Sequence, residues 1–231
     1  AARSCDRQPM SLIIKICGLK TPETLEAAIA AGVDWVAFNF FPKSPRFVSY
    51  TEASTLSHIA KGRVEIVALV VDPSDDELDE MVETVRPDRL QLHGHETPDR
   101  VASIRARYDR PVVKAIGIAE AADLETARTY SSAADWLLLD AKPPKNAILP
   151  GGNGVAFDWH LLAGLDLQKP FMVSGGLDPS NVGQAIAISH PAGVDVSSGV
   201  ESAPGVKDPA KIQAFIEAAR AASREDLRNK K

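Results

Sequence analysis

Short apolar runs recur along the chain and are separated by longer, more polar stretches. Most of these runs lack the polar alternation of a half-exposed strand, which is the pattern of parallel strands whose outer faces are covered by helices. Eight runs are long enough to be buried strands, and they span residues 12–16, 33–41, 64–71, 90–93, 112–116, 136–139, 171–174 and 194–196.

The stretches between these runs carry helix-start signals. Four of them place Thr or Asp directly before proline, as suits the N-cap and the first helical position. These pairs are Thr21-Pro22, Thr97-Pro98, Asp178-Pro179 and Asp208-Pro209. A capping box at 74–77 predicts a further helix. Apolar residues follow at helical spacing, for example Leu78, Met81, Val82 and Val85, so each helix is expected to bury one face.

Eight strands alternating with helices over about 220 residues match a (β/α)8 barrel. The predicted fold class is therefore α/β, as a single TIM barrel over residues 10–222. Residues 1–9 are expected to be a disordered leader, or residues added upstream of Met10, and residues 223–231 a polar tail that frays. A doubly wound dinucleotide-binding sheet is disfavoured, because no Gly-x-Gly-x-x-Gly follows the first run.

Composition narrows the classes of partner. The chain has 231 residues, 45% of them hydrophobic, which is a globular composition. Lys and Arg total 26 against 31 Asp and Glu, and the net charge of −5 argues against a nucleic-acid partner. No apolar run approaches the roughly 20 residues that span a bilayer, so no membrane segment is predicted. Only Cys5 and Cys17 occur, which favours a reducing, cytoplasmic compartment without a structural disulfide.

In a TIM barrel the active site forms at the carboxyl ends of the strands, so the polar residues that follow each run are candidates. They are Cys17, Asn39, Asp72, His93, Asp140, Ser174 and Ser197. Glycines follow the last two runs: Gly175-Gly176 after the seventh, and Gly199, preceded by Ser197-Ser198, after the eighth. They predict a phosphate cradle because glycine lets the backbone approach an anion closely. Ordinary turn glycines are the alternative.

Three side chains are candidates for binding and catalysis. Two prolines stiffen residues 41–46 and are expected to present Arg46 to a substrate carboxylate, unless it is an ordinary solvated arginine. Cys17 and Asp140 are a candidate base and acid. The thiol would need a polarised setting to ionise, and the carboxyl would need burial to keep its proton. The alternatives are a small buried hydrophobe for Cys17 and a loop cap for Asp140.

The remaining motifs point to no metal and no cofactor. Neither His-Glu-x-x-His nor paired Cys-x-x-Cys occurs, and the glycine-rich segment 151–154 lacks the Lys-Ser/Thr of a P-loop. Among the histidines, His93 follows a strand and is expected to line the pocket, whereas His95 could equally be exposed. The other three, His58, His160 and His190, fall in predicted helices or at their ends.

Six motifs, in order along the chain, resemble those of the phosphoribosylanthranilate isomerase family. They are KICGL at 15–19, FPKSPR at 41–46, LQLHG at 90–94, LLD at 138–140 followed by GGNG at 151–154, SGGL at 174–177 and VDVSSGVE at 194–201. The only departures are minor: the leader, the polar tail, and Ser174 where alanine is frequent in the family.

The resemblance implies an Amadori rearrangement in tryptophan biosynthesis, without a cofactor. N-(5-phosphoribosyl)anthranilate, a phosphosugar, would become 1-(2-carboxyphenylamino)-1-deoxyribulose 5-phosphate in a monomer or homodimer. By this resemblance Asp140 is the acid, Cys17 the base and Arg46 the carboxylate anchor. The 5-phosphate would be held by Gly175, Gly176, Ser197, Ser198 and Gly199, and His93 would line the site in a role that the motifs do not assign.

Two alternatives keep the phosphate cradle and change the function. Another phosphosugar barrel, such as an indole-glycerol-phosphate synthase or a sugar-phosphate epimerase, would rely on lysine and glutamate or on metal-bound carboxylates at the strand ends. A non-catalytic barrel that senses a metabolite or serves as an assembly subunit would need neither Cys17 nor Asp140.

Overall fold

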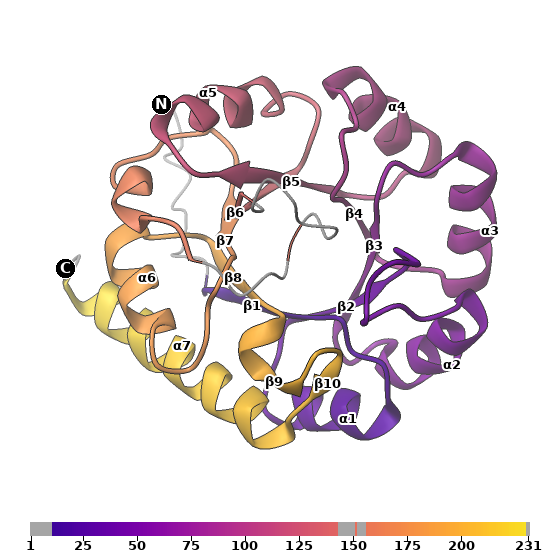
Figure 1. Ribbon diagram of the computed structural model, residues 1–231, viewed down its shortest axis with the longest axis horizontal. Coiled ribbons are helices and arrows are strands. Elements are labelled where there is room, and N and C mark those ends of the chain that lie inside the picture. The colour runs from indigo at the N-terminus through magenta and orange to yellow at the C-terminus, as the bar shows by residue number, and fades with distance from the viewer. Residues whose placement is uncertain (1–10, 143–150, 152–155, 230–231) are drawn as a thin grey trace, which may run out of the picture.

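The computed structural model describes residues 11–142, 151 and 156–229. Within them, eight parallel strands close into a barrel in chain order, and helices surround the barrel (Figure 1). The barrel strands are β1 (Ile13–Cys17), β2 (Trp35–Asn39), β3 (Glu65–Val70), β4 (Arg89–Leu92), β5 (Val112–Ile118), β6 (Trp136–Ala141), β7 (Phe171–Val173) and β8 (Gly193–Val196). Each strand overlaps one of the predicted runs, so the predicted TIM barrel is confirmed.

The described helices begin mostly where the capping signals predicted. They are α1 (Pro22–Ala30), α2 (Tyr50–Ala60), α3 (Asp75–Val85), α4 (Pro98–Tyr108), α5 (Ala121–Thr129), α6 (Val182–Ser189) and α7 (Pro209–Asn229). The side chains of Thr21, Ser74 and Thr97 each accept a hydrogen bond from a backbone N–H in the first turn. Asp208 does the same for Ala210 at the start of α7. Between β6 and β7 the described residues form only a short 3-10 helix, η1 (Trp159–Leu162).

The predicted helix start at Asp178-Pro179 is wrong. The Asp178 carboxylate accepts hydrogen bonds from the backbone of Ser180 at 2.7 Å and of Asn181 at 3.2 Å, and α6 begins only at Val182. Asp side chains that bind their own downstream backbone compete with helix formation and favour a turn. The Asp-Pro pair therefore closes a turn ahead of the helix.

The C-terminal boundary also differs from the prediction. Helix α7 continues without a break to Asn229, so residues 223–229 are helical and form no separate tail. Asp226 pairs with His190 at 2.8 Å, which attaches this last part of α7 to the end of α6. Helix-forming charged residues and this ion pair extend the helix past Ala222. The predicted leader at residues 1–9, with Cys5, lies outside the described residues.

Both faces of the barrel strands are buried, and alternate residues face different cores. One cluster fills the barrel interior and includes Ala37, Leu69 and Leu138. The other lies between strands and helices and includes Ile16 and Phe38. Because side chains alternate along a strand, a residue two positions before a strand-end residue points into the barrel directly beneath it.

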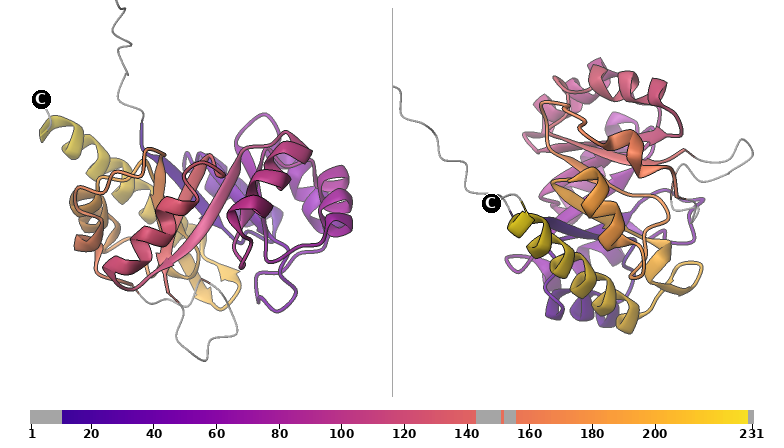
Figure 2. Two further views of the ribbon diagram at one scale, coloured as in Figure 1. Left: turned by 90° about the horizontal axis from the view of Figure 1, so that it is seen from above. Right: turned by 90° about the vertical axis from the view of Figure 1, so that its left-hand side faces the viewer.

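A short hairpin that the sequence did not predict follows β8. After the 3-10 helix η2 (Ser198–Val200), β9 (Glu201–Ala203) pairs antiparallel with β10 (Val206–Lys207). A Cβ atom at Gly205, at the hairpin tip, would overlap the backbone of Pro45, so the absence of a side chain lets the hairpin pack on the loop that follows β2. In the left-hand view of Figure 2, this hairpin lies at the opposite end of the barrel from the start of β1 and the C-terminal end of α7. Of the described helices, none combines the length and apolar character that crossing a membrane requires.

Candidate active site

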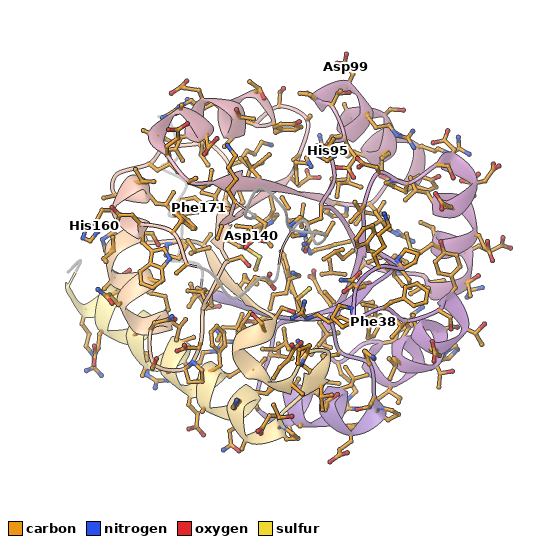
Figure 3. The ribbon with its side chains drawn as sticks, viewed as in Figure 1. Phe38, His95, Asp99, Asp140, His160 and Phe171 are labelled. Atoms are coloured by element: carbon orange, nitrogen blue, oxygen red, sulfur yellow. The ribbon has the colours of Figure 1, made fainter. Side chains whose placement is uncertain are left out.

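A pocket opens at the carboxyl ends of the strands, as the sequence predicted. Among the residues that line it are ten of the candidates: Cys17, Asn39, Arg46, His93, Asp140, Ser174, Gly175, Gly176, Ser197 and Ser198. Asp140 lies inside the ring of strands, whereas Asp99 and His160 lie at the outer edge of the molecule (Figure 3). These ten residues come from six of the eight barrel strands or from the loops that follow them, and they meet at one cavity.

Two candidates lie away from this cavity. A side chain at Gly199 would overlap the carbonyl oxygen of Leu177, so this glycine permits η2 to pack on the loop after β7. Asp72 lies at the exposed rim, where its Oδ1 accepts a hydrogen bond from the His95 backbone at 2.5 Å. The His95 side chain is 97% exposed, so it does not take part in the pocket.

The proposed acid, Asp140, is tightly enclosed. It is 3% exposed, its Oδ1 accepts a hydrogen bond from Ala141 N at 2.9 Å, and its Oδ2 lies 3.3 Å from His93 Nε2. A Cβ atom at Gly175 would lie 3.0 Å from Oδ1, and one at Gly151 would overlap Oδ2. Both glycines therefore let the chain close around this buried carboxyl.

The proposed base, Cys17, is a buried free thiol at the end of β1. Burial raises its pKa above the ordinary thiol value, although the positive charges of Lys15, Lys207 and Arg46 act in the opposite direction. The polarised setting that the sequence analysis required is present, but desolvation of the thiolate outweighs it. Without a ligand, Cys17 is thus a protonated thiol at neutral pH.

This pKa can be measured directly. The absorbance of the thiolate near 240 nm should be titrated in the native protein and in Cys17→Ala, and the difference assigned to Cys17. Because burial raises the pKa, the difference should develop only above about pH 8.5, the usual thiol value. Full development of the thiolate signal by pH 8 would contradict this assignment.

Arg46 is neither solvated nor presented alone. It is 5% exposed, and its Nε and Nη2 donate to Glu201 Oε1 and Oε2 at 2.7 and 3.0 Å. Lys207 Nζ donates to the same carboxylate at 2.7 Å and to Ser197 O at 2.9 Å. Two buried cations thus share one carboxylate beside the pocket.

The glycine pair after β7 has a backbone conformation that favours glycine. Gly175 and Gly176 have φ values of +82° and +62°, which side-chain-bearing residues rarely adopt. A Cβ at Gly175 would also lie 2.5 Å from Ala141 N. Simple turn glycines would not need this close approach to β6, so the pair serves the shape of the pocket.

Sequence reasoning missed the ionic groups beneath and beside the pocket. Lys15 Nζ pairs with Asp195 Oδ1 at 2.8 Å inside the barrel, and Ser174 Oγ donates to Asp195 Oδ2 at 3.1 Å. Gln91, which is fully buried, lines the pocket as well. A signal was available, since each of Lys15, Gln91 and Asp195 is a polar residue two positions before a strand-end candidate.

Comparison with known proteins identifies this architecture. The family model for N-(5'phosphoribosyl)anthranilate (PRA) isomerase matches residues 14–218. An N-(5'-phosphoribosyl)anthranilate isomerase from Mesorhizobium japonicum is 55% identical over 213 residues, covering 92% of this chain and 97% of that protein.

Two solved structures that resemble this chain belong to the same family. The crystal structure of phosphoribosyl anthranilate isomerase from Thermotoga maritima has a TM-score of 0.83 at 34% identity, covering 91% of this chain and 99% of that one. A phosphoribosyl anthranilate isomerase in complex with reduced 1-(o-carboxyphenylamino)-1-deoxyribulose 5-phosphate has a TM-score of 0.78 at 32% identity, with the same coverage. The strand-end pocket, the motifs and these matches together show that the chain belongs to the phosphoribosylanthranilate isomerase family.

Proposed function

We propose that this chain converts N-(5-phosphoribosyl)anthranilate into 1-(2-carboxyphenylamino)-1-deoxyribulose 5-phosphate in tryptophan biosynthesis, with Asp140 as acid and Cys17 as base. Family membership supports the reaction. The observation that carries the roles is the shared pocket, in which the thiol and the carboxyl come from β1 and β6, two different strands that β7 and β8 separate in the closed barrel. An acid and a base on two sides of one substrate are what an aldose–ketose isomerisation needs.

The first step opens the sugar ring. Asp140 gives its proton to the ring oxygen, the bond between C1′ and that oxygen breaks, and its electron pair stays on the oxygen. The lone pair of the anilino nitrogen forms a C=N bond, which leaves a positively charged iminium. Asp140 becomes a carboxylate that can accept a hydrogen bond from Ala141 N.

The second step moves the C2′ proton. The Cys17 thiol first loses its proton to solvent; the thiolate then removes the C2′ proton, and the freed electron pair forms a C1′=C2′ bond that neutralises the iminium nitrogen. The product is an enolamine, which yields the ketone when the O2′ proton leaves and C1′ gains a proton. The positive charge of the iminium beside Cys17 favours the thiolate, and so opposes the effect of burial on the pKa of this thiol.

Two anion anchors orient the substrate in this account. Arg46 binds the anthranilate carboxylate, and the backbone of Gly175 and Gly176, with residues 197–199, holds the 5-phosphate. Lys207 links the two anchors, because it contacts Ser197 in the phosphate loop and the Glu201 carboxylate that holds Arg46. Binding both ends of the substrate orients its reacting carbons between the acid and the base, so the catalytic groups do not have to bind the substrate themselves.

One chain supplies every group used here, so a monomer and a homodimer are both compatible with the activity. A cytoplasmic location belongs to the same proposal, because a reducing compartment keeps the Cys17 thiol free for catalysis.

Turnover by the purified protein is the direct test. Phosphoribosylanthranilate is added without metal or nucleotide, and loss of substrate fluorescence is followed. We expect turnover that needs no additive. A protein that binds inorganic phosphate or the product analogue tightly, yet leaves the substrate unchanged, would support a non-catalytic phosphate-binding barrel instead.

The carboxylate anchor can be tested separately with Arg46→Ala. Loss of a charge-assisted, two-pronged contact should raise KM about 10- to 100-fold and change kcat much less, if the contact is equally strong in ground and transition states. Arg63→Ala is the matched control, because Arg63 forms an exposed pair with Glu26 far from the pocket. Unchanged KM and kcat in Arg46→Ala would remove Arg46 from the binding site.

A further inference from the structure

A fully buried amide lies behind the acid. Gln91, on β4, is 0% exposed, and its Nε2 lies 3.3 Å from Nδ1 of His93. The other ring nitrogen of His93, Nε2, lies 3.3 Å from Asp140 Oδ2. The three side chains therefore form a row that begins inside the barrel and ends at the proposed acid.

The amide determines where the imidazole carries its proton. The Gln91 amide is oriented with its nitrogen toward His93 Nδ1, and because an amide nitrogen can only donate, this orientation requires Nδ1 to accept and to carry no proton. The ring proton then lies on Nε2, which faces Asp140. In this tautomer the N–H of His93 points at the Asp140 carboxyl, because the hydrogen bond at one ring nitrogen sets which nitrogen carries the proton.

Folding does not explain Gln91. Among the described residues its carbonyl oxygen Oε1 has no hydrogen-bond partner, although the atom is buried. An unsatisfied buried acceptor costs about 1–3 kcal/mol, and a leucine or methionine of similar size would avoid that cost. A residue that is unfavourable for stability and lies in the site is expected to serve the site.

We propose that Gln91 is a positioning residue for the acid, acting through the tautomer of His93; this inference rests on the proposed function of Asp140. When Asp140 gives its proton to the ring oxygen, a carboxylate remains. That carboxylate then accepts hydrogen bonds from His93 Nε2–H on Oδ2 and from Ala141 N–H on Oδ1. With the opposite tautomer, a bare Nε2 would face the new negative charge and the ring-opening step would be harder.

Two substitutions separate the possibilities. Gln91→Met keeps the volume and removes the donor, so His93 becomes free to carry its proton on either nitrogen. Gln91→Glu in its ionised form supplies only acceptors, which draw the ring proton to Nδ1. Leu92→Met is the matched control, because Leu92 is buried on the same strand but faces the outer core.

The first readout is the tautomer itself. In protein labelled with ¹⁵N histidine, the His93 signals are assigned by their loss in His93→Asn. The native protein should show an unprotonated Nδ1 and a protonated Nε2, Gln91→Met a mixture, and Gln91→Glu a proton on Nδ1. A native His93 protonated on Nδ1 would overturn the inference, whatever the activity.

The second readout is turnover. Gln91→Met should lower kcat about tenfold, which is the worth of one hydrogen bond, with KM within about twofold of native. Gln91→Glu should lower kcat at least as much, and the kcat of Leu92→Met should stay near the native value. An active native enzyme in which both Gln91 variants keep their full kcat would overturn the inference alone. A native protein without turnover would overturn the proposed function, and with it this role for Gln91.

Discussion

Replacement of Cys17 by alanine is expected to lower kcat by about two to four orders of magnitude, the usual worth of a positioned general base. Among the described residues, apolar side chains such as Ala37 and Leu69 pack in the same cluster as Cys17, and the Asp195 carboxylate that acts on the thiol is held in an ion pair with Lys15, so it is a poor replacement base. The change removes a single sulfur atom from a buried position, so the fold and the two anion anchors should persist.

Steady-state kinetics and binding of the reduced product analogue should be measured on the same preparation. Binding close to native, together with the loss of turnover, would place the effect on the chemical step. Cys5→Ala is the matched control, since it removes the other thiol of the chain and should leave kcat unchanged. Turnover of Cys17→Ala within a few-fold of native would show that another group removes the C2′ proton.

Asp140→Asn should cause a loss of similar size, about two to four orders of magnitude in kcat. An amide has nearly the shape of a carboxyl and can still accept the hydrogen bond from Ala141 N, but it has no acidic proton for the ring oxygen. Its NH2 group on the other side would meet the N–H of His93, which adds a clash between two donors.

Asp72→Asn provides the comparison for this variant. Asp72 also follows a barrel strand, but it lies at the exposed rim and outside the pocket, and its φ of +47° is one that asparagine tolerates. We expect near-native kcat for Asp72→Asn. Equal losses in the two variants, or near-native turnover in Asp140→Asn, would assign ring opening to another acid.

The strands and most helix starts could be predicted because their signals are local. Apolar runs marked all eight barrel strands, and the capping residues Thr21, Ser74 and Thr97 marked helices directly. The helix start at Asp178 was predicted wrongly, because an Asp side chain can cap a helix or close a turn, and the surrounding loop decides which it does. Similarly, the polar composition after Ala222 did not reveal that Asp226 would pair with His190.

Site residues at the strand ends could be predicted from the sequence. Site residues that are held by partners far away in the sequence could not. Barrel geometry brings Cys17 and Asp140 together once the strands are known. The Glu201 carboxylate that holds Arg46 lies 155 positions away in an unpredicted hairpin, and no local pattern signals that pairing. Gln91 and Lys15 were visible as polar residues within apolar runs, and strand alternation alone would have placed them beneath His93 and Cys17.

The most direct test is a crystal structure of this protein with reduced 1-(o-carboxyphenylamino)-1-deoxyribulose 5-phosphate. We predict that Cys17 Sγ lies about 3–3.5 Å from C2′, with the Asp140 carboxyl on the other side of the sugar near its O4′ oxygen. The phosphate should contact the backbone at Gly175 and Gly176, and the carboxylate should contact Arg46. A sugar bound with C2′ and O4′ remote from both side chains would contradict the assignment of base and acid.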